Sequence, residues 1–170
     1  MKNPKRRKPA FHGFPKGCAS QLARAAEAAL GGKDAVTPGE INIVMVSDAR
    51  IRALNRQYRG TDRITDVLTF KFPGKPLCGD IYISSGRSRK QSKEAGNTWF
   101  QELCYLVLHG VLHLLDYTDY RPAERKIMFA IQDRIFKQFK NPASSAGRQR
   151  SKFRCSLSGN YLYSSPVAAP

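Results

Sequence analysis

The sequence LCYLVLHGVLHLL, residues 103–115, is the longest mainly apolar stretch of the chain. With Trp99 and Phe100 just before it, this stretch would place apolar side chains on almost every side of a helix. A helix that is apolar all round is buried at the centre of a fold, and a run of this length is too short to span a membrane. The stretch therefore predicts a central buried helix, opened by Thr98, around which the rest of the chain packs.

Three segments upstream of this helix have the composition and alternation of β-strands. They are INIVMV at 41–46, DVLTFKF at 66–72 and GDIYIS at 79–84. Pro73, Gly74 and Pro76 supply a turn between the last two segments, which predicts that these two form a hairpin.

Three further helices are expected. The first covers 19–30 and is ended by Gly31 and Gly32, and the second covers 48–59, is capped by Ser47 or Asp48 and is ended by Gly60. The third runs from Pro122 to a stop at Asn141 and Pro142. Ile127, Ile131, Ile135 and Phe139 recur every four residues and predict the buried stripe of the last helix. Residues 85–94 are polar and basic, which predicts an exposed helix or an ordered loop. The fold class is thus α+β: a small mixed sheet of three to four strands covered by helices, with a central buried helix that carries two histidines.

Positive charge is concentrated at both ends of the chain. Of the 29 Lys and Arg residues, six lie in 1–17 and four in 141–170, and neither stretch contains an acidic residue. Residues 1–16 are expected to form a basic flexible arm with a short edge strand at 10–14, and 141–170 a basic disordered tail. Residues 17–140 are expected to form a single domain.

The formal net charge of +16 favours a polyanionic partner, nucleic acid first, with a general solubility effect as the alternative. No apolar segment follows the basic N-terminus, so we expect neither a secretory signal nor membrane association. The four cysteines form no C-x-x-C pair and are expected to be free thiols in a cytoplasmic protein.

Two of the three histidines, His109 and His113, lie four residues apart within the apolar stretch. This spacing places both imidazoles on one helix face, about one turn apart, where they can bind one metal ion. Burial of two imidazoles among leucines costs free energy unless they have partners. The residues alone leave two interpretations open: a metal site, or two core histidines that bond to backbone or carboxylate groups.

Two aspartates follow the pair, and either could complete a set of two histidines and one carboxylate that leaves a position for water or substrate. Asp116 lies seven residues after His109 and would share its face if the helix continued. Asp119 lies six residues after His113, beyond the expected helix end. Because Asp116 could instead stand in a helix-ending turn and Asp119 could cap the next helix, both have structural alternatives.

The residue after His109 is Gly110, whereas zinc proteases of the H-E-x-x-H type have a glutamate there as general base. Peptide hydrolysis by that route is therefore disfavoured. A glycine at this position also permits close packing of the helix backbone.

Four motifs, which follow one another along the chain in the same order as in the family, resemble those of the YbeY family of rRNA-maturation factors. Residues 109–115 are similar to the start of the pattern H-G-x-L-H-L-x-G-Y-D-H, and 55–60 to N-x-x-Y-R-G/K. Residues 65–70 are similar to the strand T-D-V-L-S-F, and 79–81 match a strand that starts G-D-I. The resemblance covers roughly residues 40–137.

The resemblance implies a zinc-dependent endoribonuclease that acts in 3′-end maturation of small-subunit ribosomal RNA and in ribosome quality control. Its implied partners are ribosomal RNA and the small ribosomal subunit, with ribosomal proteins as a further class. A non-catalytic RNA-binding assembly factor with a weakened metal site is the alternative.

The resemblance also implies one Zn²⁺ per chain at the mouth of a basic groove, with His109 and His113 as ligands. The family's third histidine falls at Asp119, so Asp119 is favoured over Asp116 as the third ligand. A carboxylate oxygen is an acceptable zinc ligand, and its negative charge would make the ion less Lewis-acidic. Arg59 matches the arginine that faces the metal in the family and is expected to hold a phosphate.

Overall fold

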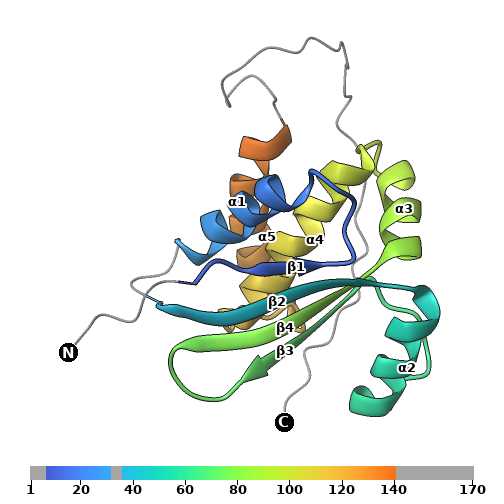
Figure 1. The fold of residues 1–170 in the computed structure, drawn as a ribbon, viewed down its shortest axis with the longest axis horizontal. Helices are drawn as coiled ribbons and strands as arrows, with labels where there is room; N and C mark the ends of the chain where they lie inside the picture. The colour runs from blue at the N-terminus through green and yellow to red at the C-terminus, as the bar shows by residue number, and fades with distance from the viewer. Residues whose placement is uncertain (1–6, 32–35, 141–170) are drawn as a thin grey trace.

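The computed structural model describes residues 7–31 and 36–140. The expected tail at 141–170, the helix end predicted at 141–142 and residues 1–6 of the expected arm lie outside the described residues. The elements are, in order, β1 (Ala10–His12), α1 (Ala19–Leu30), β2 (Pro38–Val46), α2 (Asp48–Arg59), β3 (Val67–Phe72), β4 (Leu77–Ser84), α3 (Ser85–Glu94), α4 (Trp99–Leu114) and α5 (Pro122–Lys140) (Figure 1). The predicted α+β class is confirmed.

Four strands form one mixed sheet in the order β1-β2-β4-β3. Strands β1 and β4 lie on the two sides of β2, and both are parallel to it. Strands β3 and β4 form the predicted antiparallel hairpin, in which Val67 lies opposite Ile83 and Phe72 opposite Cys78. The edge strand expected within 10–14 is present at Ala10–His12.

Helix α4 is the buried centre predicted from residues 103–115. Thr98 caps it, because its hydroxyl accepts from the Gln101 N–H while the Gln101 side chain accepts from the Thr98 N–H. All residues from Glu102 to Leu114 are buried, since α4 packs on β3 and β4 and on α1, α3 and α5. Helices α1, α4 and α5 lie together on one side of the sheet (Figure 1).

Helix α4 lies close against the sheet at Gly110. A Cβ added at this position would lie 2.5 Å from Cγ2 of Ile81 in β4. The backbone carbonyl of Gly110 also accepts a hydrogen bond from the Thr69 hydroxyl of β3, at 3.4 Å. The turn of α4 between the two histidines is therefore fixed directly against the hairpin.

Helix α2 covers the opposite face of the sheet. Its Ile51 and Leu54 pack on Leu68 in a second, smaller core, because successive side chains of β3 point to opposite faces. Ser47 caps the helix by accepting from a backbone N–H of the first turn, and Gly60 ends it with a left-handed φ of 65°, as predicted. The last residue of α2 is Arg59.

Residues 85–94 form a helix, α3. An exposed helix and an ordered loop were the two structures expected for this segment. The Ser84 hydroxyl caps its first turn by accepting from the Arg87 N–H. Arg89 places its guanidinium carbon 3.6 Å from the centre of the Trp99 ring, which links α3 to the start of α4. None of the helices in residues 7–31 and 36–140 has both the length and the apolar character needed to cross a bilayer.

The buried face of α5 differs from the predicted stripe. It consists of Met128, Gln132, Ile135 and Phe136, whereas Ile127 is 58% exposed. The prediction was wrong only at Ile127, because Ile135 is buried and Ile131 and Phe139 pack against the main core. Gln132 occupies the buried position because it has hydrogen-bond partners in α4, and a satisfied polar group is stable in a core.

Candidate metal centre

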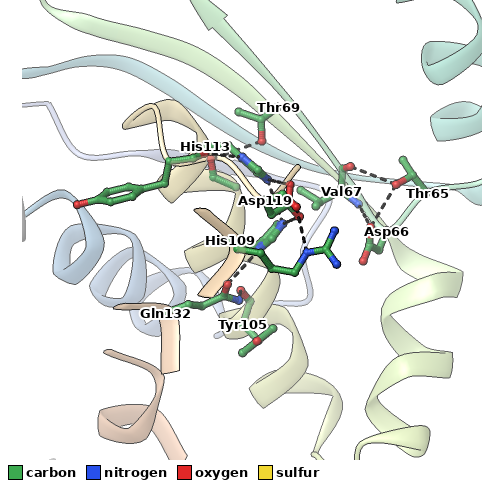
Figure 2. Close-up of polar contacts among 12 residues, drawn as sticks. Thr65, Asp66, Val67, Thr69, Tyr105, His109, His113, Asp119 and Gln132 are labelled. Carbon is green, nitrogen blue, oxygen red and sulfur yellow. Dashed lines mark hydrogen bonds and ion pairs between the residues drawn. The ribbon is translucent and has the colours of Figure 1, made fainter. Parts of the chain in front are cut away.

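His109 and His113 lie on the same face of α4, one turn apart, and both are buried. Their Nε2 atoms are 3.0 Å apart and their rings are perpendicular. Figure 2 shows the two rings pointing toward each other and toward Asp119. The predicted pairing of these side chains is thus present in the fold.

Each imidazole has an acceptor at its other nitrogen. Nδ1 of His109 lies 3.0 Å from Oε1 of Gln132, whose amide is oriented because its Nε2 donates to the Tyr105 carbonyl. Nδ1 of His113 lies 2.9 Å from the carbonyl oxygen of Tyr117. Because both partners only accept, each neutral ring carries its proton on Nδ1. Both Nε2 atoms then present lone pairs to the same point, as metal-binding histidines do.

Asp119 completes the cluster. Its carboxylate lies 3.8 Å from Nε2 of His109 and 4.0 Å from Nε2 of His113. Asp119 is buried, and neither carboxylate oxygen has a hydrogen-bond partner among the residues that the structure describes. One ligand atom from each of the three residues lies within 4.8 Å of the others. Two lone pairs and an unsatisfied carboxylate fit a divalent cation, which would compensate the burial of all three groups.

Burial also sets the protonation of this cluster. Burial, together with the neighbouring His109, lowers the pKa of His113 to about 3, although the Tyr117 carbonyl acts in the opposite direction. Burial raises the pKa of the Asp119 carboxyl, while His109 and Arg125 act to lower it. His113 is therefore neutral at pH 7, with its Nε2 lone pair available for a cation.

Asp116, the other candidate ligand, is turned away from the cluster. It has a left-handed φ of 66°, and both its carboxylate oxygens lie 2.6 Å from Nζ of Lys71 in β3. Its side chain is 68% exposed. Helix α4 ends at Leu114, so Asp116 does not continue the face that carries His109.

The loop that carries Asp119 is held at four consecutive residues. Asp116 pairs with Lys71, and the carbonyl of Tyr117 faces His113. The Thr118 hydroxyl donates to Glu124 at 2.6 Å, and the carbonyl of Asp119 accepts from Nε of Arg125 at 3.0 Å. Each residue of the loop thus has a partner in a neighbouring strand or helix.

Arg59 lies beside the cluster at the end of α2. Its side chain is half-buried, and its Nε and Nη1 atoms are buried with no hydrogen-bond partner in the described part of the chain. Burial lowers the pKa of Arg59, while Tyr120 and Asp119 oppose this effect, and the charge of Arg59 acts on His113 in turn. Arg59 therefore lies within electrostatic reach of His113 and Asp119 and has two donors that no described residue satisfies.

Residues at the start of β3 lie near the cluster (Figure 2). Asp66 is buried; its Oδ1 accepts from the Val67 N–H and the Thr65 hydroxyl, and its Oδ2 accepts from Gln91. The negative charge of Asp66 contributes to the raised pKa of Asp119. Asp66 therefore adds negative potential to the cluster, which favours a cation there.

Sequence reasoning missed the residues that orient the cluster, above all Gln132 and Arg125. Gln132 gave no signal, because α5 has polar residues along its whole length and only its packing on α4 shows that this one is buried. Arg125 had no signal, because its contact is to a backbone carbonyl that only the loop conformation brings within reach.

Comparison with known proteins gives a consistent result. A family model described as Endoribonuclease YbeY matches residues 13–140. The Endoribonuclease YbeY of Endomicrobium trichonymphae is 47% identical over 127 residues, which are 75% of this chain and 89% of the relative. That of Pelotomaculum thermopropionicum is 43% identical over 116 residues, 63% of this chain and 76% of the relative.

A solved structure has the same fold. The solution structure of TM1509 from Thermotoga maritima superposes with a TM-score of 0.57 at 28% sequence identity, covering 84% of this chain and 99% of the other. The match to the family model and the identity to its curated relatives both extend over most of the described chain. This chain belongs to the YbeY family.

Proposed function

We propose that this protein is a metal-dependent endoribonuclease. The observation that carries the proposal is the position of Arg59, whose two buried, unpartnered nitrogens lie beside a cluster of three metal-ligand side chains. A phosphodiester is an anion that can use both features, the cation and the guanidinium. The similar proteins from Endomicrobium trichonymphae and Pelotomaculum thermopropionicum, both named endoribonucleases, support this choice.

The residues of the site have distinct parts in this proposal. His109, His113 and Asp119 would hold one Zn²⁺ per chain, which supplies Lewis acidity toward a phosphate oxygen. The Gln132 side chain and the Tyr117 carbonyl keep the imidazole protons on Nδ1. Arg59 binds a non-bridging phosphate oxygen and stabilises the negative charge that develops during cleavage.

The proposed substrate is the 3′ end of precursor small-subunit ribosomal RNA, and the proposed biological role includes ribosome quality control. The net charge of +16 supports a polyanionic partner, and affinity should therefore fall steeply with salt. The reaction would take place in the cytoplasm, on the small ribosomal subunit, with ribosomal proteins as further contacts.

The test compares Arg59→Ala with Arg56→Ala, an exposed arginine in the last turn of the same helix. The substrate is a 3′-extended small-subunit RNA, incubated with zinc-loaded protein. Removal of a group that stabilises developing charge costs about 10²–10³ in rate, so Arg59→Ala should lose cleavage while its metal content stays normal. Arg56→Ala should cleave as the wild type does. Normal cleavage by Arg59→Ala would overturn the role of Arg59.

One observation favours a second function, a non-catalytic RNA-binding assembly factor. Asp119 stands where the family pattern has a histidine, and its negative charge reduces the Lewis acidity of a bound cation. The same experiment separates the two functions. RNA binding without cleavage, by wild-type protein that carries no metal after incubation with zinc, would support the assembly factor.

A further inference from the structure

A second arginine, Arg125, lies at the same site and belongs to α5. It is in the first turn of that helix, and its Nε donates to the carbonyl oxygen of Asp119 at 3.0 Å. Its charge acts on the Asp119 carboxylate, as that of Arg59 does. Two guanidinium groups, one from the end of α2 and one from the start of α5, therefore lie within electrostatic reach of the Asp119 carboxylate.

The terminal nitrogens of Arg125 are available to a ligand. Its side chain is exposed, and within residues 7–31 and 36–140 its only polar partner is the Asp119 carbonyl. One turn earlier, Arg121 is paired with Glu124 across 3.9 Å. The bond from Nε fixes the plane of the Arg125 guanidinium and leaves both terminal nitrogens to donate elsewhere.

The position of Arg125 is electrostatically unfavourable within the protein itself. A helix N-terminus carries partial positive charge, so a cation in the first turn destabilises it and an anion stabilises it. Arg125 also shares its surroundings with Arg59 and with any bound divalent cation. This concentration of positive charge suits a ligand with more than one negative charge, such as two successive phosphates of RNA.

We propose that Arg125 binds the RNA phosphate next to the one held at Arg59. The inference rests on the proposed endoribonuclease function and deepens it by assigning a second phosphate-binding position. The planar guanidinium is suited to this contact, because its two terminal N–H groups match two oxygens of one phosphate. Arg125 thus sets the register of the RNA strand, whereas Arg59 acts on the phosphate that reacts.

The test measures binding of a single-stranded 12-nucleotide RNA to the full-length, zinc-loaded protein over a range of KCl concentrations. Each phosphate contact with single-stranded RNA contributes about 0.7 to the slope of log K against log salt. Arg125→Gln should lower this slope by about 0.7 and weaken binding several-fold. Lys126→Gln, which removes the same charge from the neighbouring exposed position, should change the slope by much less.

Arg125→Lys separates phosphate binding from a role in positioning Asp119. It keeps the charge, so it should restore the slope while it lacks the two-pronged contact. In cleavage assays Arg125→Gln should raise KM with little change in kcat. A slope for Arg125→Gln equal to that of Lys126→Gln would overturn the inference. The inference would also be overturned if Arg125→Gln lowered the slope while losing metal and Arg125→Lys did not restore the slope.

The outcome for the wild type distinguishes this inference from the proposed function. If wild-type protein cleaves RNA and Arg125→Gln behaves like Lys126→Gln, only the second phosphate position is rejected. If wild-type protein neither binds nor cleaves RNA, both are rejected.

Discussion

The Nε2 atoms of His109 and His113 lie 3.0 Å apart, and when both rings are neutral the acceptors at their Nδ1 atoms leave neither Nε2 with a proton to donate. Two lone pairs at this distance repel each other unless a cation lies between or beside them. The unsatisfied carboxylate of Asp119 faces the same point. The hydrogen bonds around the cluster therefore favour a bound cation over a pair of ordinary core histidines.

Purified protein should contain about one metal ion per chain, because three ligands are the usual protein set of an open zinc site. His113→Ala and Asp119→Ala should each lose the ion. Asp116→Ala should keep it, since Asp116 bonds to Lys71 outside the cluster. Elemental analysis by mass spectrometry measures all four proteins. If only Asp116→Ala lost the ion, the third ligand would be Asp116 and the assignment to Asp119 would be wrong.

Gln132→Leu should weaken metal binding roughly 10- to 100-fold, because removal of a partner that orients a ligand histidine has this effect. Gln132→Glu retains an acceptor for the Nδ1 proton of His109 and should bind the ion at least as tightly as Gln132→Leu does. The measurement is competition with a chromophoric chelator. Gln138→Leu, at an exposed position of the same helix, is the control, and equal affinities for the two leucine variants would refute the role of Gln132.

Gly110→Ala should destabilise the protein. Alanine gains about 1 kcal/mol of helix propensity over glycine, but overpacking costs roughly 1–3 kcal/mol, and the new Cβ would lie 2.5 Å from Cγ2 of Ile81. Urea denaturation of metal-free protein gives the free energy of unfolding. Combination with Ile81→Ala should cost less than the sum of the two single changes, because the truncated side chain makes room. Strict additivity would contradict the proposed contact.

The Cys104 thiol should resist alkylation in the native protein. Burial, with a smaller contribution from Cys18, raises the pKa of Cys104 to about 12, and only the thiolate reacts. At roughly pH 8.5, which is close to the ordinary pKa of a thiol, iodoacetamide should label the partly exposed Cys18 and Cys78 first. Peptide mass spectrometry before and after denaturation measures this, and rapid native labelling of Cys104 would contradict it.

The same thiol predicts the direction of a stability change at alkaline pH. Above about pH 9 the unfolded chain loses the Cys104 proton while the folded protein keeps it until about pH 12. The folded state binds more protons in this window, so the contribution of Cys104 to stability falls as pH rises. Cys104→Ala should remove that contribution, which urea denaturation at pH 8 and pH 10 would measure.

The elements that the sequence predicted well are those specified by local patterns. Residues 103–115 are apolar on all sides, and the helix they form is buried on all sides. Thr98, Ser47 and Gly60 carry the capping chemistry expected of them. These features depend on neighbouring residues alone, so they can be read without knowledge of the tertiary structure.

The exposure of Ile127 and the burial of Gln132 in α5 could not be predicted in the same way. A stripe from Ile127 to Phe139 satisfies hydrophobic periodicity, but the fold exposes Ile127 and buries Gln132, whose side chain contacts His109. That contact comes from another helix, 23 positions away in the chain. Hydrophobic pattern alone therefore placed an exposed isoleucine in the core.

The choice between Asp116 and Asp119 depended on where α4 ends. Helix geometry favoured Asp116 only for a helix that continued, whereas the chain leaves the helix after Leu114 and Asp116 adopts a left-handed conformation. That turn sends Asp116 toward Lys71 and brings Asp119 back to the histidines. The binding of metal by His109, His113 and Asp119, and the phosphate role of Arg59, stay predictions.

The anchoring of the loop at residues 116–119 has a thermodynamic consequence for ligand capture. Fixing the backbone of one residue costs roughly 1–2 kcal/mol of conformational entropy. Since each of these four residues already has a partner in the fold, that entropy is lost during folding and not during capture of a cation. The Asp119 carboxylate is thus preorganised, and the strength of cation binding reflects the donor atoms themselves more than closure of a loop.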